Sequence, residues 1–142
     1  MDDMLDTMYA ANGIGLAAIQ IGIPKNVVVI DLNKHKKNLP MFFVNPKIMS
    51  KSKSLTKYEE GCLSIPNLFA EIKRPSECEI KYLDYFGKEK TLKASGLLAT
   101  CIQHEVDHLK GILFIDYLSK LKKDIILKKL SKQKMDQKRL VI

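Results

Sequence analysis

The amino-acid sequence predicts an α+β domain, because segments with strand character come first and helical segments follow. A run of β-branched residues at 27–30 and strict alternation of apolar and charged residues at 77–83 indicate strands. Helical segments at 95–110 and 118–137 close the sequence. Without internal repeats or a linker-like stretch, the 142 residues are expected to form a single domain, 1–142.

The amino-terminal segment predicts a helix end followed by a stretch of small residues. Residues 5–11 continue a helical spacing of apolar side chains, and the Asn12-Gly13 pair is expected to stop that helix through the left-handed conformation of glycine. Residues 13–20 are too small and apolar for a solvent-exposed loop, which predicts backbone that another group approaches closely. The lysine-rich segment 33–40 is expected to be an exposed turn.

The middle of the chain predicts short strands joined by turns. Strands are expected at 42–44, 48–49 and 88–92, with a polar, basic hairpin-like segment at 51–57. In the strand at 77–83, Cys78, Ile80 and Tyr82 lie on one face and are expected to point to the core. In the last helix, Leu118, Leu121, Ile125 and Leu130 are expected to pack inward, with lysines on the solvated face.

Composition restricts the classes of protein that the chain can belong to. A formal charge of +8 and a pI near 9.3 suggest an acidic partner surface. Three cysteines and an acidic start without a signal peptide argue against a disulfide framework and predict a cytoplasmic protein. No apolar run reaches the ~20 residues that cross a bilayer, so no membrane partner is expected.

The clearest motif is His104-Glu105-Val106-Asp107-His108, an HExxH pattern in the predicted helix at 95–110. Residues four positions apart share a helical face, so both imidazoles can reach one metal ion, and Glu105 can reach a water bound to it. A solvated pattern of charges on a helix is the alternative, and HExxH alone leaves both interpretations open.

A catalytic site of this type needs a third protein ligand. The longer metzincin pattern is excluded, because Phe114 stands where its last histidine would be. His35, within the lysine-rich turn, is expected to be a surface residue. Cys62 lies between Gly61 and a Ser-Ile-Pro turn, which favours an exposed, strained position over a core one.

Three separated segments together resemble the motifs of the peptide deformylase family. They are GIGLAAIQ at 13–20, EGCLS at 60–64 and QHEVDH at 103–108, in the order and spacing of the family. The resemblance implies small antiparallel or mixed β-sheets around a central helix that carries HExxH, with a basic helix at the carboxyl end. It also implies a metal-dependent hydrolase that removes the N-formyl group from the formylmethionine of nascent polypeptides and releases formate.

The same resemblance implies one divalent metal ion per chain, bound by Cys62, His104 and His108 with water or hydroxide in the fourth position. Fe²⁺ is the expected native ion, and Zn²⁺, Ni²⁺ or Co²⁺ can occupy such a site. It further implies the catalytic residues: Glu105 as proton shuttle, and the Gln20 side chain and Leu63 backbone N–H as donors to the developing oxyanion.

The substrate is expected, by resemblance, to be an N-formylmethionyl nascent peptide in extended form. It would pair with backbone near Ile14 and Gly15, much like an added strand. The implied substrate-binding residues are Gly13, Ile14, Gly15, Glu60, Leu97 and Cys101.

For other residues near these motifs, a role in the site is weighed against a position in the core or on the surface. Cys101 is expected to line the pocket or the core rather than bind metal, and Cys78 to lie in the core. Asp107 either orients a neighbour or lies on the helix surface. Arg74 either meets the substrate backbone or, as we favour, forms a surface ion pair. For Gln103 the sequence does not choose between a supporting contact and solvent.

Two rival functions are set against the deformylase interpretation. A related metallohydrolase would use the same atoms with another pocket, but the segment 13–20 and the motif around Cys62 argue against it. A silent ribosome- or RNA-binding protein would be expected to have replaced Glu105 or Cys62, and it has replaced neither.

The resemblance also bears on partners and on the domain. It implies a monomer whose basic carboxyl-terminal helix either contacts RNA phosphates at the ribosome surface or forms a solvated face. Most family members carry several tens of residues before the segment that matches Met1, so the amino-terminal part of the family domain is expected to be absent here.

Overall fold

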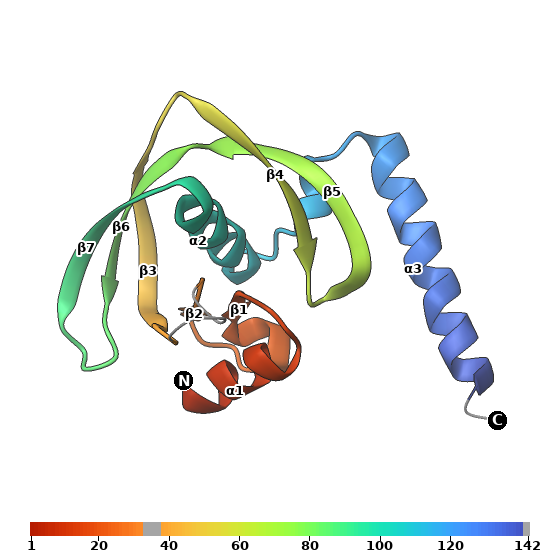
Figure 1. Ribbon diagram of the computed structural model, residues 1–142, viewed down its shortest axis with the longest axis horizontal. Coiled ribbons are helices and arrows are strands. Elements are labelled where there is room, and N and C mark those ends of the chain that lie inside the picture. The colour runs from red at the N-terminus through yellow and green to blue at the C-terminus, as the bar shows by residue number, and fades with distance from the viewer. Residues whose placement is uncertain (33–37, 141–142) are drawn as a thin grey trace.

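The computed structural model describes residues 1–32 and 38–140, with side chains up to residue 138 (Figure 1). The elements are α1 (Asp2–Ala10), β1 (Gly15–Ala17), η1 (Ala18–Ile21), β2 (Val27–Ile30), β3 (Met41–Lys51), β4 (Leu55–Cys62), β5 (Ile65–Pro75), β6 (Glu77–Leu83), β7 (Glu89–Ser95), α2 (Gly96–Leu109), η2 (Phe114–Tyr117) and α3 (Lys120–Leu140). Residues 33–37, which include His35, lie outside the described residues, so the expectation for that histidine stays a prediction.

The strands form two antiparallel sheets. One sheet has the order β1-β2-β3-β6-β7, and the other is the β4–β5 hairpin. Helix α2 lies between them, as Figure 1 shows. The α+β prediction, with a central helix that carries HExxH, is therefore confirmed.

Helix α2 is buried along nearly its whole length, from Ala99 to His108. Its apolar residues Ala99, Ile102 and Val106 pack on the five-stranded sheet. The polar residues of the same stretch are buried as well. Because a buried polar group is costly unless it is hydrogen-bonded, these side chains need partners from the surrounding elements.

Several local predictions are confirmed. Strands β2 and β6 have the predicted bounds, and Cys78 and Ile80 are buried. Helix α1 ends where expected, but the left-handed residue is Asn12, with φ of 57°, instead of Gly13. Asparagine tolerates this region because its short polar side chain can bond locally.

Other local predictions are wrong. The strands expected at 42–44 and 48–49 are one strand, β3, in which Asn45 has φ of 49° beside a shift of register against β6. A β-bulge of this kind bends a strand without ending it. The long hairpin arm β5 was not predicted at all.

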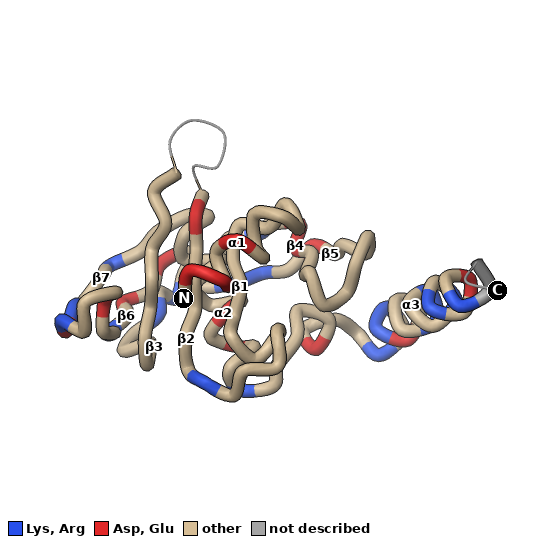
Figure 2. The backbone as a smooth tube through the Cα atoms, turned by 90° about the horizontal axis from the view of Figure 1, so that it is seen from below, with Lys and Arg blue, Asp and Glu red and all other residues tan. Residues whose placement is uncertain are grey.

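Helix α3 extends away from the rest of the molecule (Figures 1 and 2). Its packed side chains are Ile126, 8% exposed, and the half-buried Leu130. Leu121 and Ile125 were expected to face inward, but they are 71% and 45% exposed. Leu118 and Leu130 pack against the body as predicted, whereas the prediction was wrong for Leu121 and Ile125. No helix among the described residues is long and apolar enough to span a membrane.

Candidate active site

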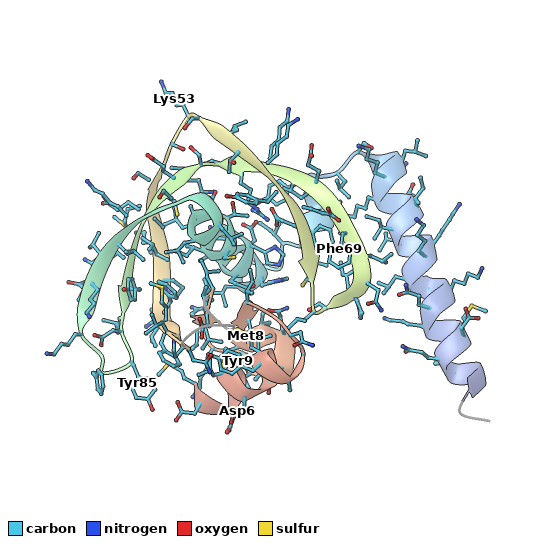
Figure 3. All side chains as sticks on the ribbon, in the orientation of Figure 1. Asp6, Met8, Tyr9, Lys53, Phe69 and Tyr85 are labelled. Atoms are coloured by element: carbon cyan, nitrogen blue, oxygen red, sulfur yellow. The ribbon has the colours of Figure 1, made fainter. Side chains whose placement is uncertain are left out.

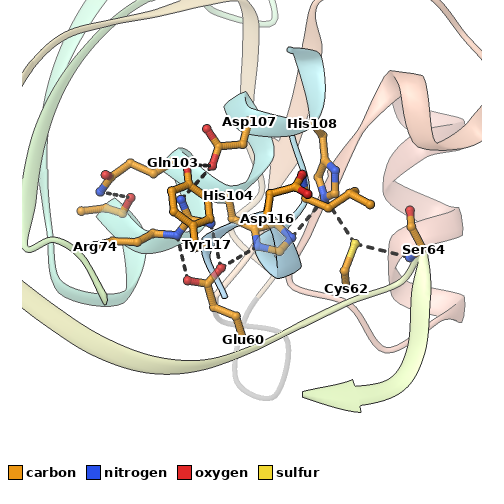
Figure 4. A network of polar contacts seen from close by, with 12 residues as sticks. Glu60, Cys62, Ser64, Arg74, Gln103, His104, Asp107, His108, Asp116 and Tyr117 are labelled. Carbon is orange, nitrogen blue, oxygen red and sulfur yellow. Dashed lines mark hydrogen bonds and ion pairs between the residues drawn. The ribbon is translucent and has the colours of Figure 1, made fainter. Parts of the chain in front are cut away.

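The proposed metal ligands converge from two elements. Cys62 is the last residue of β4, and His104 and His108 are one turn apart on α2. The Cys62 Sγ atom lies 3.3 Å from Nε2 of His108, which lies 3.1 Å from Nε2 of His104. The three donor atoms all lie within 4.8 Å of one another (Figure 4). Tetrahedral bonds of about 2.0–2.3 Å would place such donors roughly 3.5 Å apart, so the set fits one metal ion.

The electrostatics around Cys62 favour its ligating form. Burial raises the pKa of the thiol, but hydrogen bonds with His104 and His108 outweigh this and lower it to about 5. The backbone N–H of Ser64 and the side chain of Gln20 also point to Sγ, each at 3.4 Å. A thiolate at neutral pH is the form that binds a metal.

Glu105 is enclosed beside these ligands. It is 5% exposed, and its Oε2 atom has no hydrogen-bond partner among the described residues. Burial is the largest cause that raises the pKa of Glu105, to about 7, with the charge of Cys62 adding to it and the two histidines opposing it. A carboxyl with a pKa near neutrality can both accept and return a proton.

The amide of Gln20 is oriented by its own helical turn. The backbone N–H of Ala17 donates to Oε1 at 2.8 Å, which leaves Nε2 as the end that faces Ser64 Oγ at 3.0 Å and Cys62 Sγ. The amide donor therefore lies beside the candidate metal ligands.

A cavity of about 570 Å³ joins these residues, between the 13–20 segment, the β4–β5 hairpin and α2. Its walls include every residue that the sequence predicted for the site except His108: Gly13, Ile14, Gly15, Gln20, Glu60, Cys62, Leu63, Leu97, Cys101, His104 and Glu105. Burial raises the pKa of the Cys101 thiol to about 12, so this cysteine is a neutral wall residue. Tyr58, Thr100 and Phe69 also line the cavity and were not predicted. Of these, Phe69 is labelled in Figure 3.

Comparison with known proteins agrees with this geometry. The polypeptide deformylase family matches residues 1–124. A peptide deformylase of Pelagibacter ubique is 67% identical over 96% of this chain and 80% of its own length. The chain belongs to the polypeptide deformylase family.

Solved structures of peptide deformylases share the fold. The enzyme from Legionella pneumophila superposes with a TM-score of 0.90 at 46% identity, over 97% of this chain and 80% of that one. The enzyme from Ehrlichia chaffeensis in complex with actinonin gives 0.87 at 44% identity, over 93% and 80%. This deformylase is a metal-dependent hydrolase that removes the N-formyl group from the formylmethionine of nascent polypeptides and releases formate.

Behind the candidate metal ligands of this deformylase lies a buried polar network. Glu60 lines the cavity, but both of its carboxylate oxygens are engaged by Arg74, and one of them also by His104. Burial opposes ionisation of Glu60, yet the hydrogen bonds with His104 and Arg74 lower its pKa below the ordinary value. Arg74 is 3% exposed, so the surface ion pair expected for it is wrong.

The network includes two further residues. Asp107 is 8% exposed and accepts hydrogen bonds from Arg74 and Tyr117, so it orients neighbours and does not face solvent. Tyr117 was not among the residues predicted from the sequence. Gln103, 1% exposed, donates to the carbonyls of Pro75 and Ala99, which settles its role as a buried contact between α2 and β5.

Proposed function

We propose that Cys62, His104 and His108 hold the metal ion, and that Glu105, Gln20 and Leu63 carry out deformylation beside it. The main support is the convergence of the three donor atoms within 4.8 Å in a cavity wall that also contains the buried carboxyl of Glu105. A divalent ion bound there supplies Lewis acidity, which makes water nucleophilic near neutral pH and polarises a carbonyl.

Glu105 manages the proton in this proposal. Its Oε2 atom, without a partner among the described residues, takes the proton from the attacking water. The same carboxyl then gives that proton to the amine nitrogen as the C–N bond breaks. Its pKa of about 7 lets both transfers occur at neutral pH.

The oxyanion that develops on the formyl oxygen needs hydrogen-bond donors. Gln20 offers Nε2, since its Oε1 is already engaged by the N–H of Ala17. Leu63 offers its backbone N–H from the turn between β4 and β5, directly after Cys62.

The peptide substrate is held along β1. This strand is at the edge of the five-stranded sheet, so a substrate in extended form can add to it near Gly13, Ile14 and Gly15. The methionine side chain then enters the part of the cavity bounded by Ile14, Leu97 and Cys101, with Glu60 behind it.

The wider setting is part of the proposal. Residues 1–142 act as one domain and as a monomer in the cytoplasm, with Fe²⁺ as the native ion. Helix α3 contacts the ribosome surface. Support comes from its many lysines, marked in Figure 2, most of which are exposed, and from the cavity walls, which include no described residue of α3.

Release of formate from formyl-Met-Ala-Ser tests this function directly. The protein is purified without oxygen and loaded with Fe²⁺, or with Ni²⁺ as a second ion. We expect turnover that a chelator abolishes and that returns when the ion is restored. Folded, metal-loaded protein without turnover would contradict the assigned roles. Because a related enzyme has been solved with actinonin, a rise in melting temperature on adding actinonin serves to show that the cavity is formed.

A further inference from the structure

We propose that Arg74 and Tyr117 are positioning residues of the metal centre, which hold the His104 imidazole in its ligating orientation through Glu60 and Asp107. The inference rests on the proposed role of His104 as a metal ligand. The four supporting residues come from four elements: Glu60 from β4, Arg74 from β5, Asp107 from α2 and Tyr117 from η2.

The contacts form one continuous chain, drawn in Figure 4. The Nδ1 atom of His104 lies 2.8 Å from Oε1 of Glu60. Arg74 donates to both oxygens of Glu60, from Nε at 2.8 Å and from Nη2 at 3.0 Å. Its remaining nitrogen, Nη1, donates to Oδ2 of Asp107 at 2.8 Å.

Tyr117 completes the chain at its far end. Its hydroxyl donates to the same Oδ2 atom of Asp107 at 2.6 Å, and its ring lies 4.7 Å from the guanidinium carbon of Arg74. The tyrosine therefore fixes Arg74 twice, through the shared carboxylate and through the ring face. Because Tyr117 is 49% exposed, its hydroxyl can be removed without opening the core.

The network determines which nitrogen of His104 is available. A carboxylate only accepts hydrogen bonds, so Oε1 of Glu60 requires a proton on Nδ1. Nε2 is then the ligating nitrogen, and it is the atom that lies 3.1 Å from Nε2 of His108. Partners of this kind fix the tautomer and the ring orientation of a metal-binding histidine.

A contribution to the stability of the fold does not by itself explain why these charged residues are buried together. Glu60, Arg74 and Asp107 are all buried, and buried ion pairs can often be replaced by apolar residues without loss of stability. These three hydrogen bonds require arginine at position 74, because only a planar guanidinium can donate to Glu60 from two nitrogens and to Asp107 from the third. A lysine would keep the charge and lose this fork.

The test compares Arg74→Lys and Tyr117→Phe with a matched control, Tyr85→Phe. Tyr85 is also a partly exposed tyrosine whose hydroxyl bonds an aspartate, Asp2, but it lies on the β6–β7 turn and does not line the cavity. Each protein is loaded with Co²⁺. The readouts are the Co²⁺ dissociation constant from chelator competition, the visible absorption of bound Co²⁺, and kcat and KM for formyl-Met-Ala-Ser.

We expect Arg74→Lys to weaken Co²⁺ binding by about 10–100-fold and Tyr117→Phe by up to about tenfold. Both should alter the Co²⁺ absorption and lower kcat while KM stays the same, and Tyr85→Phe should behave like the parent. Because Tyr117 acts through Arg74, the double variant should lose little more than Arg74→Lys alone.

Unchanged Co²⁺ affinity and absorption in folded Arg74→Lys or Tyr117→Phe protein would overturn the inference. If Arg74→Lys does not fold, Tyr117→Phe carries the test, since it keeps the ring over the guanidinium. Failure of the proposed function itself looks different: the parent protein would then not deformylate the peptide, whatever the variants do.

Discussion

The α-carbon of Gly15 lies directly against the carboxylate of Glu105. A Cβ atom at position 15 would stand 2.6 Å from Oε1 of Glu105, closer than real Cβ atoms approach other atoms, and 3.0 Å from its Cδ. The glycine that borders the substrate strand is thus also the residue that makes room for the proposed proton shuttle. The close approach expected for the 13–20 segment is confirmed, with Glu105 as the approaching group.

Replacing Gly15 by alanine should therefore impair catalysis. The added methyl would displace the Glu105 carboxyl from the attacking water, and a misplacement of about 1 Å can cost on the order of 100-fold in rate. We expect kcat to fall by roughly that factor while the metal content stays at that of the parent. Gly13→Ala is the comparison, since its methyl would meet the flexible end of Leu63 at 2.9 Å. An equal loss of kcat in both variants would contradict the specific role of Gly15.

Metal binding and proton transfer should be separable by mutation. Cys62→Ala removes one of the three donors, so we expect the purified protein to lose its metal and its turnover together. Glu105→Ala should keep the metal and lose about 10²–10⁴-fold in kcat, because only the proton shuttle is removed. Metal content by elemental analysis and formate release measure the two effects. Full activity in Glu105→Ala would show that another group moves the proton.

We expect the protonated hydroxyl of Tyr9 to stabilise the folded state and this stabilisation to be lost at alkaline pH. Burial, together with the hydrogen bond that its hydroxyl donates to Asp31, raises the pKa of Tyr9 from 10.0 to about 12. The folded state therefore retains this proton where the unfolded chain loses it. The stabilisation is complete below pH 10 and declines between pH 10 and about pH 12.

Urea unfolding of the parent and Tyr9→Phe measures this contribution. The free energy of unfolding of the parent should fall more steeply from pH 10 to 12 than that of Tyr9→Phe, and the two slopes should agree between pH 7 and 9. Parallel slopes over the whole range would show that Tyr9 titrates alike in the folded and unfolded states.

Ribosome contact through α3 predicts a salt-dependent association. Lys128, Lys129 and Lys132 are exposed on this helix, and each phosphate contact that is lost should reduce the dependence of affinity on salt. We expect the triple change to glutamine to weaken co-sedimentation with ribosomes, while kcat/KM on a free formyl peptide is unchanged. A matched triple change of Lys47, Lys51 and Lys93 is the control, because these exposed lysines lie on β3 and β7 of the five-stranded sheet and not on the hairpin that packs on α3. Equal effects of both sets would indicate unspecific attraction by net charge.

The fold was predictable where a local pattern carries it. Strands β2 and β6 were predicted with their exact bounds because a β-branched run and a period of two are properties of adjacent residues. Strand β5 was not predicted from the sequence, because one of its inward-facing positions is Arg74. A buried arginine looks polar in sequence, and only its partners Glu60 and Asp107 make that position an interior one.

For the site, too, local patterns were predictable and contacts between distant elements were not. The sequence by itself determined that His104 and His108 share a helical face and that Glu105 lies between them, because the helical repeat fixes such neighbours. With the family motifs it also predicted Cys62 as the third metal ligand and Gln20 as a donor to the oxyanion. The tertiary structure alone decided that Arg74, Asp107 and Tyr117 join behind His104, and that Gly15 lies against Glu105. These contacts depend on how two sheets pack around α2, and packing between elements distant in the chain leaves no periodic signal in the sequence.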